Sequence, residues 1–513
     1  MCDKHPPAQT YDPKTPLAKA NDWTRRSFLN RAALFLAAMG VPWQWRMEAL
    51  EKLSGKIFGS STAFAASSGN TFLLCFGWRS GYPMDNIICD AQDLAGPGDA
   101  QRNFHATPAN VAAVPTTGGR NLYAPAQFSE ALAAITPVGA PFADRMAKMT
   151  ACKNTTGHMN GSSALWMPGG TKGTDSNAFV SHAAKMATLN PTLLSNYLVY
   201  GAKGTFDYGQ LGSLSASFTP TYGSTAQFQG LFKPTDLKAA DNTTLSSDLV
   251  NEINTVQANI DEQFIKTIET REGVDALRAG QAAVAALLKT NLSALIDPNN
   301  TTTAGYISAL TTGVTVPNTR FSTGSVSIAQ QVAVALRCIE LGICNGFGHT
   351  IDTGDWHNTQ AGSDGTNNQG ITDATGRNDG TAQARHAAWF GEFFAALLNL
   401  ADGIAVGGST IGEKLRIVHA SEFLRTINGG PATGDNGDGG HTGSILIGNG
   451  LNGGTYGDHT TAMKSLKPDL ATGDATVEGQ LDQTNLVNTI RRFVGLTDST
   501  EHDATAVLTA MVP

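Results

Sequence analysis

Short apolar runs that alternate with long amphipathic segments constrain the fold of this 513-residue chain more than any other feature. In the C-terminal third, residues 327–342 and 381–403 repeat apolar side chains at helical spacing, whereas 343–352, 413–423 and 443–450 form short runs typical of buried strands. Strands that alternate with helices predict a parallel or mixed sheet with helices on its faces. In such sheets, ligands bind beyond the carboxyl ends of the strands.

The same pattern extends less clearly toward the N-terminus. Residues 70–78, "NTFLLCFGW", form an apolar run bounded by polar residues and predict a first buried strand. The segment "PFADRMAKMTA" (141–151) is predicted to be helical. Apolar residues at steps of three and four predict a helical insertion over residues 245–300. We therefore expect one large α/β domain over residues 66–513 with this insertion within it.

The N-terminus has the arrangement of a twin-arginine export signal. In "DWTRRSFLNRAALFLAAMGVP", Arg25 and Arg26 precede an apolar stretch over residues 32–41. Residues 63–65, "AFA", supply a small-residue cleavage site, so residues 1–65 are predicted to be signal peptide and spacer. An amphipathic N-terminal helix is the alternative. The apolar stretch is too short for an ordinary transmembrane helix and no later segment qualifies, so we expect no stable membrane span. The predicted partner is the twin-arginine export machinery, and the predicted location is periplasmic or extracellular.

Composition excludes some classes of function and leaves the cysteine chemistry open. The net charge of −8 argues against a nucleic-acid-binding protein, because phosphate contacts need clustered Lys and Arg. Beyond the signal lie Cys75, Cys89, Cys152, Cys338 and Cys344. Either Cys338 with Cys344 or Cys75 with Cys89 could close a small loop, and spacing does not decide the connectivity.

Candidate metal ligands follow the predicted strands. Asp355 and His357 are two residues apart after the strand at 343–352, so in an extended segment both would face one metal ion; a polar turn is the alternative. Glu422 ends the strand at 413–423 as an oxygen ligand, a base, or the structural ion-pair partner of Arg425.

Two further histidines have different interpretations. His441, in the glycine-rich loop that also holds Asp435 and Asp438, is either a metal ligand or a solvated residue, and the alternating Asp, Asn and Gly could also bind Ca²⁺. His386 lies near the core face of the helix at 381–403, where a buried structural histidine is favoured. "GNGLNG" (448–453) leads into "GTYGDH" rather than a helix, so a dinucleotide site is not predicted. No zinc-protease motif or serine nucleophile elbow is present.

Taken together, five segments in order resemble a family of uncharacterised twin-arginine-exported bacterial proteins within the alkaline-phosphatase and sulfatase-like superfamily. These segments are "TRRSFL", "FLLCFGW", "GDWHNTQ", "ASEFLRT" and "GHTGSILIGNGLNGGTYG". The resemblance spans both ends of the chain and is closest in the last 190 residues or so. It implies a three-layer α/β/α sandwich that presents Asp, Glu and His to one or two divalent metal ions.

The resemblance also implies roles for individual residues. The implied metal ligands are Asp355, His357, Glu422, His441 and, with an insertion relative to the family pattern, Asp85. Arg425 would orient Glu422 or bind the anion, although Leu424 stands where the family has Gly. For the nucleophile, Thr156 and Ser162 lie near the family's Ser-His segment, and a metal-bound water would also serve.

The leading hypothesis is an exported metal-dependent hydrolase that acts on a small anionic phosphate or sulfate ester. Zinc or manganese is the expected cofactor, with calcium as a further option. The alternative is a non-catalytic envelope or surface protein that retains the fold and holds structural calcium. A structural or adhesive secreted protein fits the Gly, Thr and Asn content but not the ordered motifs.

Overall fold

The structure is a computed structural model that describes part of the chain. The described residues are 71–78, 84, 87–95, 111–125, 128, 142–150, 186, 198–200, 221–222, 292–314, 328–351, 382–421, 443–461, 464–497 and 502–513. The chain divides into two compact units, Met1–Thr62 with Thr225–Asp297, and Ala63–Ser224 with Pro298–Pro513. In the first unit the described residues include α11 (Leu292–Leu295). All other elements belong to the second unit.

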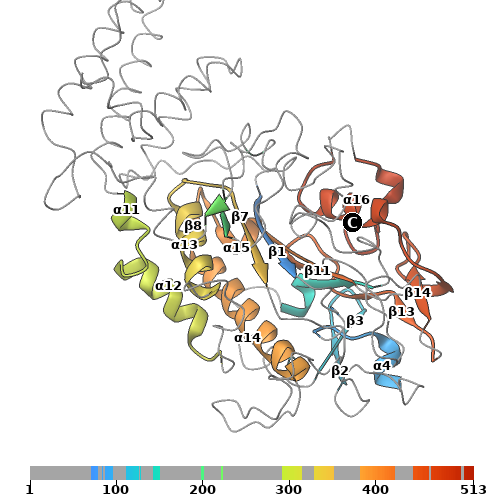
Figure 1. Ribbon diagram of the computed structural model, residues 1–513. Helices are drawn as coiled ribbons and strands as arrows, with labels where there is room; N and C mark the ends of the chain where they lie inside the picture. Colours follow the sequence, from blue (N-terminus) through green and yellow to red (C-terminus); the bar gives the residue numbers. More distant parts are fainter. Residues whose placement is uncertain are drawn as a thin grey trace, which may run out of the picture. The chain divides into compact units, whose positions relative to one another are not determined.

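A mixed sheet forms the centre of the second unit (Figure 1). Among the described residues it has eight strands in the order β12-β4-β11-β10-β1-β7-β5-β6. Their bounds are β1 Phe72–Trp78, β4 Met146–Met149, β5 Leu198–Tyr200, β6 Thr221–Tyr222, β7 Gly346–Ile351, β10 Leu415–Ser421, β11 Ser444–Gly448 and β12 Gly454–Tyr456. β11 is antiparallel to β10 and β4, and every other pairing in this sheet is parallel.

The central strand β1 is buried along its whole length, as expected for a parallel strand covered on both faces. Alternate side chains point to opposite faces. On one face, Phe76 packs edge-on against Phe394 of α14 (Ala382–Gly403), with ring centroids 5.2 Å apart. On the other face, Cys75 belongs to the apolar cluster that contains Ile490 of α16 (Gln483–Phe493). Helices therefore cover both faces of β1.

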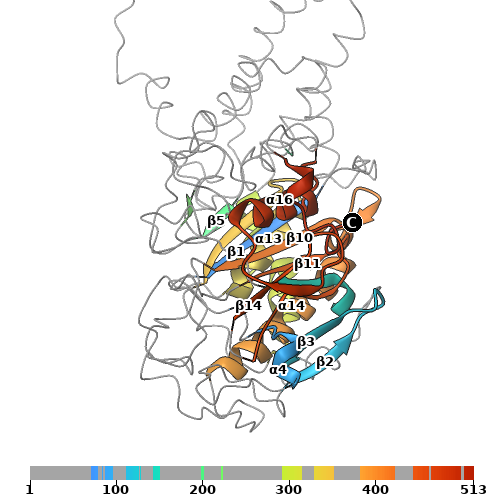
Figure 2. The same cartoon turned by 90° about the vertical axis from the view of Figure 1, so that its right-hand side faces the viewer.

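The remaining elements surround this sheet. The helices are α4 Ala91–Ala95, η3 Phe142–Arg145, α12 Thr301–Thr311, α13 Ile328–Glu340, α15 Ile411–Lys414 and η6 Ala504–Ala506. The strands of the small sheets are β2 Val111–Pro115 with β3 Asn121–Pro125, β8 Ala405–Val406 with β9 Ser409–Thr410, and β13 Asp458–His459 with β14 Ser465–Pro468 and β15 Ala475–Glu478. Figure 2 shows the hairpin of β2 and β3 beside α4.

The structure confirms a mixed α/β organisation. The helices predicted at 327–342 and 381–403 are α13 and α14, and the predicted strands in the C-terminal third are β7, β10 and β11. The signal at 1–65 lies outside the described residues, as does the insertion at 245–300 up to residue 291. Those two assignments, and the alkaline-phosphatase-like form of the sandwich, stay predictions.

One prediction of secondary structure was wrong. The segment 141–151 is not a helix: η3 occupies only Phe142–Arg145, and Met146–Met149 is strand β4. Met, Ala and Lys favour helices, but intrinsic propensity is a weak force compared with tertiary pairing. β4 lies between β11 and β12 and all of its residues are buried, so the sheet determines its conformation.

Candidate functional site

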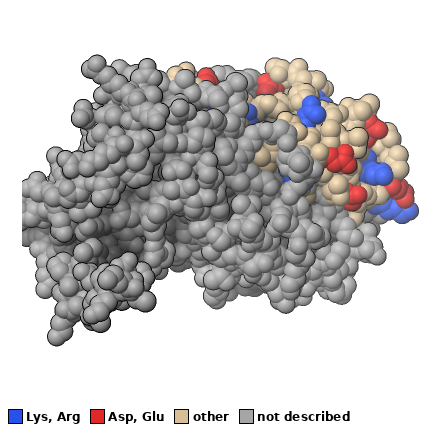
Figure 3. Space-filling model, turned by 90° about the horizontal axis from the view of Figure 1, so that it is seen from above, with Lys and Arg blue, Asp and Glu red and all other residues tan. Residues whose placement is uncertain are grey.

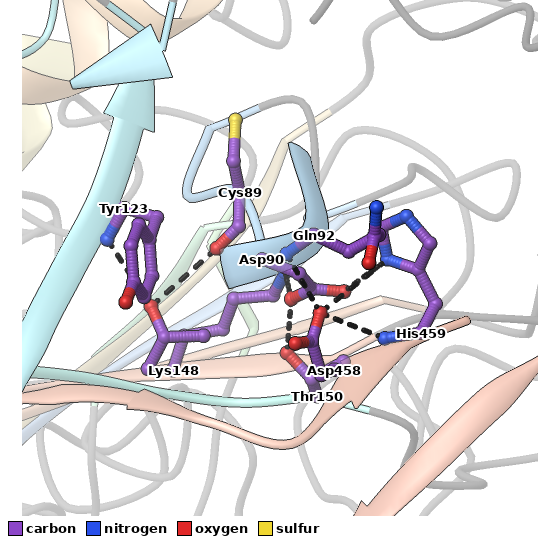
Figure 4. Close-up of polar contacts among 9 residues, drawn as sticks. Cys89, Asp90, Gln92, Tyr123, Lys148, Thr150, Asp458 and His459 are labelled. Atoms are coloured by element: carbon purple, nitrogen blue, oxygen red, sulfur yellow. Dashed lines mark hydrogen bonds and ion pairs between the residues drawn. The ribbon is translucent and has the colours of Figure 1, made fainter. Parts of the chain in front are cut away.

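A buried polar centre surrounds the carboxylate of Asp90 (Figure 4). The ammonium of Lys148 lies 2.9 Å from Oδ1, and the hydroxyl of Thr150 donates a 2.7 Å hydrogen bond to the same oxygen. The ring nitrogen Nδ1 of His459 lies 3.1 Å from the other oxygen, Oδ2. The side chains of Asp90, Lys148 and His459 are fully buried, so solvent does not screen these contacts.

Asp458 extends this Asp90 centre toward solvent. Its Oδ1 accepts hydrogen bonds from the backbone N–H groups of Gln92, at 3.0 Å, and His459, at 2.8 Å. Its side chain is 22% exposed, whereas that of Asp90 is fully buried. Burial, and after it the negative charge of Asp90, raises the pKa of Asp458 above its usual value. Asp458 therefore loses its negative charge at a higher pH than a solvent-exposed aspartate does.

Local backbone geometry brings these residues together. Lys148 is in β4, and Thr150 follows that strand directly, donating its N–H to the carbonyl of Tyr456 at the end of β12. Gly457 joins β12 to β13 with φ of +94°, a conformation that residues with a Cβ rarely adopt. A Cβ at this position would lie 3.0 Å from the Cβ of Thr150. Glycine thus allows Asp458 to follow β12 in close contact with β4.

The hairpin of β2 and β3 anchors the other side of the centre. The N–H of Cys89, the residue before Asp90, donates to the carbonyl of Tyr123 at 2.7 Å. The hydroxyl of Thr455 donates to the Cys89 carbonyl at 3.4 Å and accepts from the Tyr123 N–H at 3.3 Å. β3 and β12 therefore both restrain the chain immediately before Asp90.

The chemistry of the Asp90 centre is that of a cation site. One potential ligand atom from each of Asp90, Asp458 and His459 lies within 4.8 Å of the other two. Carboxylate oxygens with an imidazole nitrogen are ligands used by zinc and manganese. The centre also contains its own cation, because Lys148 neutralises Asp90. The residues could hold a metal ion, and a metal that bound Asp90 Oδ1 would have to displace the ammonium.

A second buried polar contact joins two neighbouring strands of the main sheet. The indole N–H of Trp78 donates to Nδ1 of His419 on β10 at 3.1 Å, so Nδ1 carries no proton. Phe76 stacks on the imidazole with centroids 4.9 Å apart, and Phe394 approaches it edge-on at 4.5 Å. Burial lowers the pKa of His419 well below its usual value. His419 is therefore a neutral histidine that joins β1 to β10 near their carboxyl ends.

The residues predicted from the sequence to form the site lie outside the described residues. They are Asp85, Thr156, Ser162, Asp355, His357, Glu422, Arg425 and His441. His386 falls within α14, but its side chain is likewise not described. The structure does place the strands that precede or follow these residues along the chain.

Those strands share one edge of the sheet. Because β1, β4, β7, β10 and β12 run in the same direction, their carboxyl ends lie on the same edge. The antiparallel strand β11 begins at that edge. In chain order, Asp85 follows β1, Thr156 and Ser162 follow β4, Asp355 and His357 follow β7, Glu422 and Arg425 follow β10, and His441 precedes β11. We call the edge of the sheet at which these parallel strands end the carboxyl edge.

The Asp90 centre, which the sequence analysis missed, lies at one end of the carboxyl edge. Thr150 follows β4 and Asp458 follows β12, the outermost strand on that side. A lysine inside the otherwise apolar run "MAKM" was one available signal, because a charge in a buried strand needs a partner. The adjacent acid and histidine of "YGDH" were another.

Comparisons with protein-family models, with curated proteins and with solved structures found no match. Among the described residues, no helix combines the length and the apolar character that crossing a membrane requires.

Proposed function

We propose that this protein is an exported metal-dependent hydrolase of phosphate or sulfate esters, built on an alkaline-phosphatase-like three-layer α/β/α sandwich. One observation carries the proposal: the strands adjacent in sequence to the predicted ligands all meet the carboxyl edge of a single mixed sheet. Ligands of open α/β sheets bind at that edge.

The proposed roles follow the family resemblance. Asp355, His357, Glu422 and His441 hold the metal, with Asp85 as a further ligand. Zinc or manganese suits these nitrogen and oxygen donors, and calcium is the option if oxygen donors dominate. When bound, the metal supplies charge stabilisation for the ester and acidifies a hydroxyl or water.

The protein's own groups orient the substrate. Arg425 binds the anionic group of the ester, or fixes Glu422 through an ion pair. Thr156 and Ser162 are the hydroxyl candidates for the nucleophile. His419 supports the end of β10, three residues before Glu422, through its bond to Trp78. Neutral His419 adds no charge to the edge where an anion binds.

The Asp90 centre has a supporting role in this proposal. Its lysine, hydroxyl and imidazole hold Asp90 between β4 and β13, and so fix one end of the carboxyl edge. Since Lys148 already provides a cation, the catalytic metal is assigned to Asp355, His357, Glu422, His441 and Asp85 rather than to the Asp90 centre.

The proposed location and partners also come from charge and from the N-terminus. The twin-arginine signal directs the chain through the corresponding export machinery to the periplasm or beyond. On the described part of the face in Figure 3, Lys and Arg alternate with Asp and Glu. Such a mixed surface, with a net charge of −8, argues against nucleic acid as the ligand. The small anionic ester is proposed from the family resemblance.

Metal content and ester hydrolysis test the proposal together. Protein purified without chelators should contain near-stoichiometric zinc or manganese, and Glu422→Ala should lose both the metal and the hydrolysis of phosphomonoesters, phosphodiesters or sulfate esters. Glu478→Ala is the matched control, because Glu478 is an exposed carboxylate paired only with exposed Lys464 among the described residues. Wild type without metal and inert toward every ester would refute the hydrolase. Calcium alone, with no hydrolysis, would support the non-catalytic alternative.

A further inference from the structure

The C-terminal end of α13 folds back on itself in a Schellman motif. Gly342 has a left-handed φ of +67°, and its N–H donates to the carbonyl of Ile339 at 3.0 Å. The next N–H, from Ile343, donates to the carbonyl of Cys338 at 2.7 Å. These two bonds define the motif and reverse the chain over the last helical turn. Cys344, directly after the reversal, is thereby brought back toward Cys338.

The thiols of Cys338 and Cys344 meet inside this turn. Both residues are fully buried, and a side-chain hydrogen bond joins them. Burial, the bond to Cys344 and its electrostatic influence all raise the pKa of Cys338. The two sulfur atoms are therefore neighbours, held by local backbone geometry rather than by a distant contact. Local geometry of this kind survives movement elsewhere in the chain.

We propose that Cys338 and Cys344 form a structural disulfide in the exported protein. Two thiols react with a low-molecular-weight disulfide by successive exchange: Cys338–SH + Cys344–SH + R–S–S–R → Cys338–S–S–Cys344 + 2 R–SH. Each protein thiol loses its hydrogen, the R–S–S–R bond is reduced, and one new S–S bond forms. Compartments outside the cytosol are oxidising, so that disulfides form and persist there.

The disulfide would fix the junction between α13 and β7. Cys338 is within the last turn of α13, and Cys344 is two residues before β7 begins at Gly346. β7 pairs with β1 at the centre of the sheet and precedes Asp355 in the chain. Because both sulfur atoms are buried, reductant reaches the bond only when this turn opens. The oxidised form is thus a stable brace, not a rapidly reversible switch.

Burial also determines when the bond forms. Exchange needs a thiolate, and the raised pKa of Cys338 disfavours it in the folded chain. Oxidation therefore proceeds quickly during refolding and slowly in the native protein. A chain exported in the folded state would acquire the bond as the end of α13 opens transiently.

Differential thiol labelling of the full-length protein tests the pairing without reference to any enzymatic activity. The protein is refolded from denaturant with oxidised and reduced glutathione, then acid-quenched, denatured and alkylated. Reduction and a second, isotopically distinct alkylation follow. Trypsin releases residues 338–377 as one peptide, since no Lys or Arg lies between Arg337 and Arg377. We expect both cysteines of this peptide to carry the second label, and to keep it when native oxidised protein is treated with dithiothreitol before quenching.

Cys75 is the internal control, because it packs in the apolar cluster that contains Ile490, whereas Cys89 belongs to a separate cluster with Val111. It should carry the first label throughout. In Cys338→Ser, Cys344 should also carry the first label; Cys344→Ala gives the reciprocal result if the serine variant does not fold. The pairing is overturned if Cys338 and Cys344 take the first label as completely as Cys75 after oxidative refolding. It is equally overturned if Cys344 remains protected in Cys338→Ser.

Discussion

Removing the ammonium of Lys148 should destabilise the protein strongly, because it leaves Asp90 as a buried charge. The two unit charges are 2.9 Å apart and both side chains are fully buried. At an effective dielectric constant of about 20, their attraction is about 6 kcal/mol, and desolvation offsets part of it. Lys148→Met keeps the length of the side chain and leaves Thr150 and His459 as partners of Asp90. We expect a loss of about 3–5 kcal/mol in the free energy of unfolding.

The double variant Asp90→Asn with Lys148→Met separates charge from shape. An asparagine Oδ1 can still accept from the hydroxyl of Thr150, and its amide can donate to Nδ1 of a neutral His459. Since the double variant removes both charges of this ion pair, it should be more stable than the sum of the two single changes predicts, by about 2 kcal/mol or more. Asp90→Asn alone should be destabilised, because it removes the carboxylate that lies 2.9 Å from the buried ammonium of Lys148.

Urea denaturation followed by tryptophan fluorescence, in buffer with a chelator, measures all four proteins. Trp78 and Trp389 lie in the core next to the main sheet, so their emission reports its loss. A change of 3–5 kcal/mol should shift the midpoint of Lys148→Met by about 1 M urea or more. Additive single changes, or a Lys148→Met midpoint within error of wild type, would refute the reasoning.

Three further predictions concern single residues. His419→Gln keeps an acceptor for Trp78. Because burial lowers the folded pKa of His419, wild type should lose more stability than the variant as the pH falls below about 6.5, by up to about 1.4 kcal/mol per pH unit. The difference between their urea midpoints, followed from pH 7 to pH 5, measures this. Gly457→Ala forces a Cβ to within 3.0 Å of Thr150 at a positive φ, so calorimetry should show a lower midpoint temperature, equivalent to about 1–3 kcal/mol; an unchanged midpoint would contradict the close approach. Gly342→Ala strains the Schellman turn and should lower the free energy of unfolding by about 1 kcal/mol, as measured by urea denaturation. Gly119→Ala is the matched control, because Gly119 also has a positive φ, of +82°, but lies in the exposed turn between β2 and β3, away from α13.

The central part of the fold could be predicted because its signals are local. Residues 70–78 were predicted to be a buried strand because they form an apolar run, and the seven residues of β1 are all buried. The helical spacing of α13 and α14 was equally visible, because a helix buried on one side repeats its apolar residues at short intervals. The prediction of a helix over residues 141–151 was wrong because the conformation of β4 depends on non-local pairing. Only pairing with β11 and β12, more than 290 residues away in the sequence, makes Met146–Met149 a strand.

The site could be predicted only where motifs lie next to strands. Glu422 was placed at a strand end, and β10 does end at the residue before it. By contrast, Asp90 and His459 are separated by 369 positions, and no property of either residue alone indicates the other. The carboxyl edge itself became visible only with the strand order, since direction and order are properties of the sheet and not of any segment.

The position of Lys148 determines whether the Asp90 centre, at one end of the carboxyl edge, can bind a metal ion. A divalent ion and an ammonium cannot both occupy the space next to Asp90 Oδ1, because like charges within a few ångströms in a buried site repel strongly. Either Lys148 remains there, and the Asp90 centre is already neutralised, or a metal displaces the ammonium from Asp90 Oδ1. Replacing Lys148 in metal-free protein, and then adding metal, distinguishes these two cases. Chelator-treated Lys148→Met should gain more stability than chelator-treated wild type on adding zinc or manganese only if the Asp90 centre binds metal, because the site proposed around Glu422 is the same in both proteins.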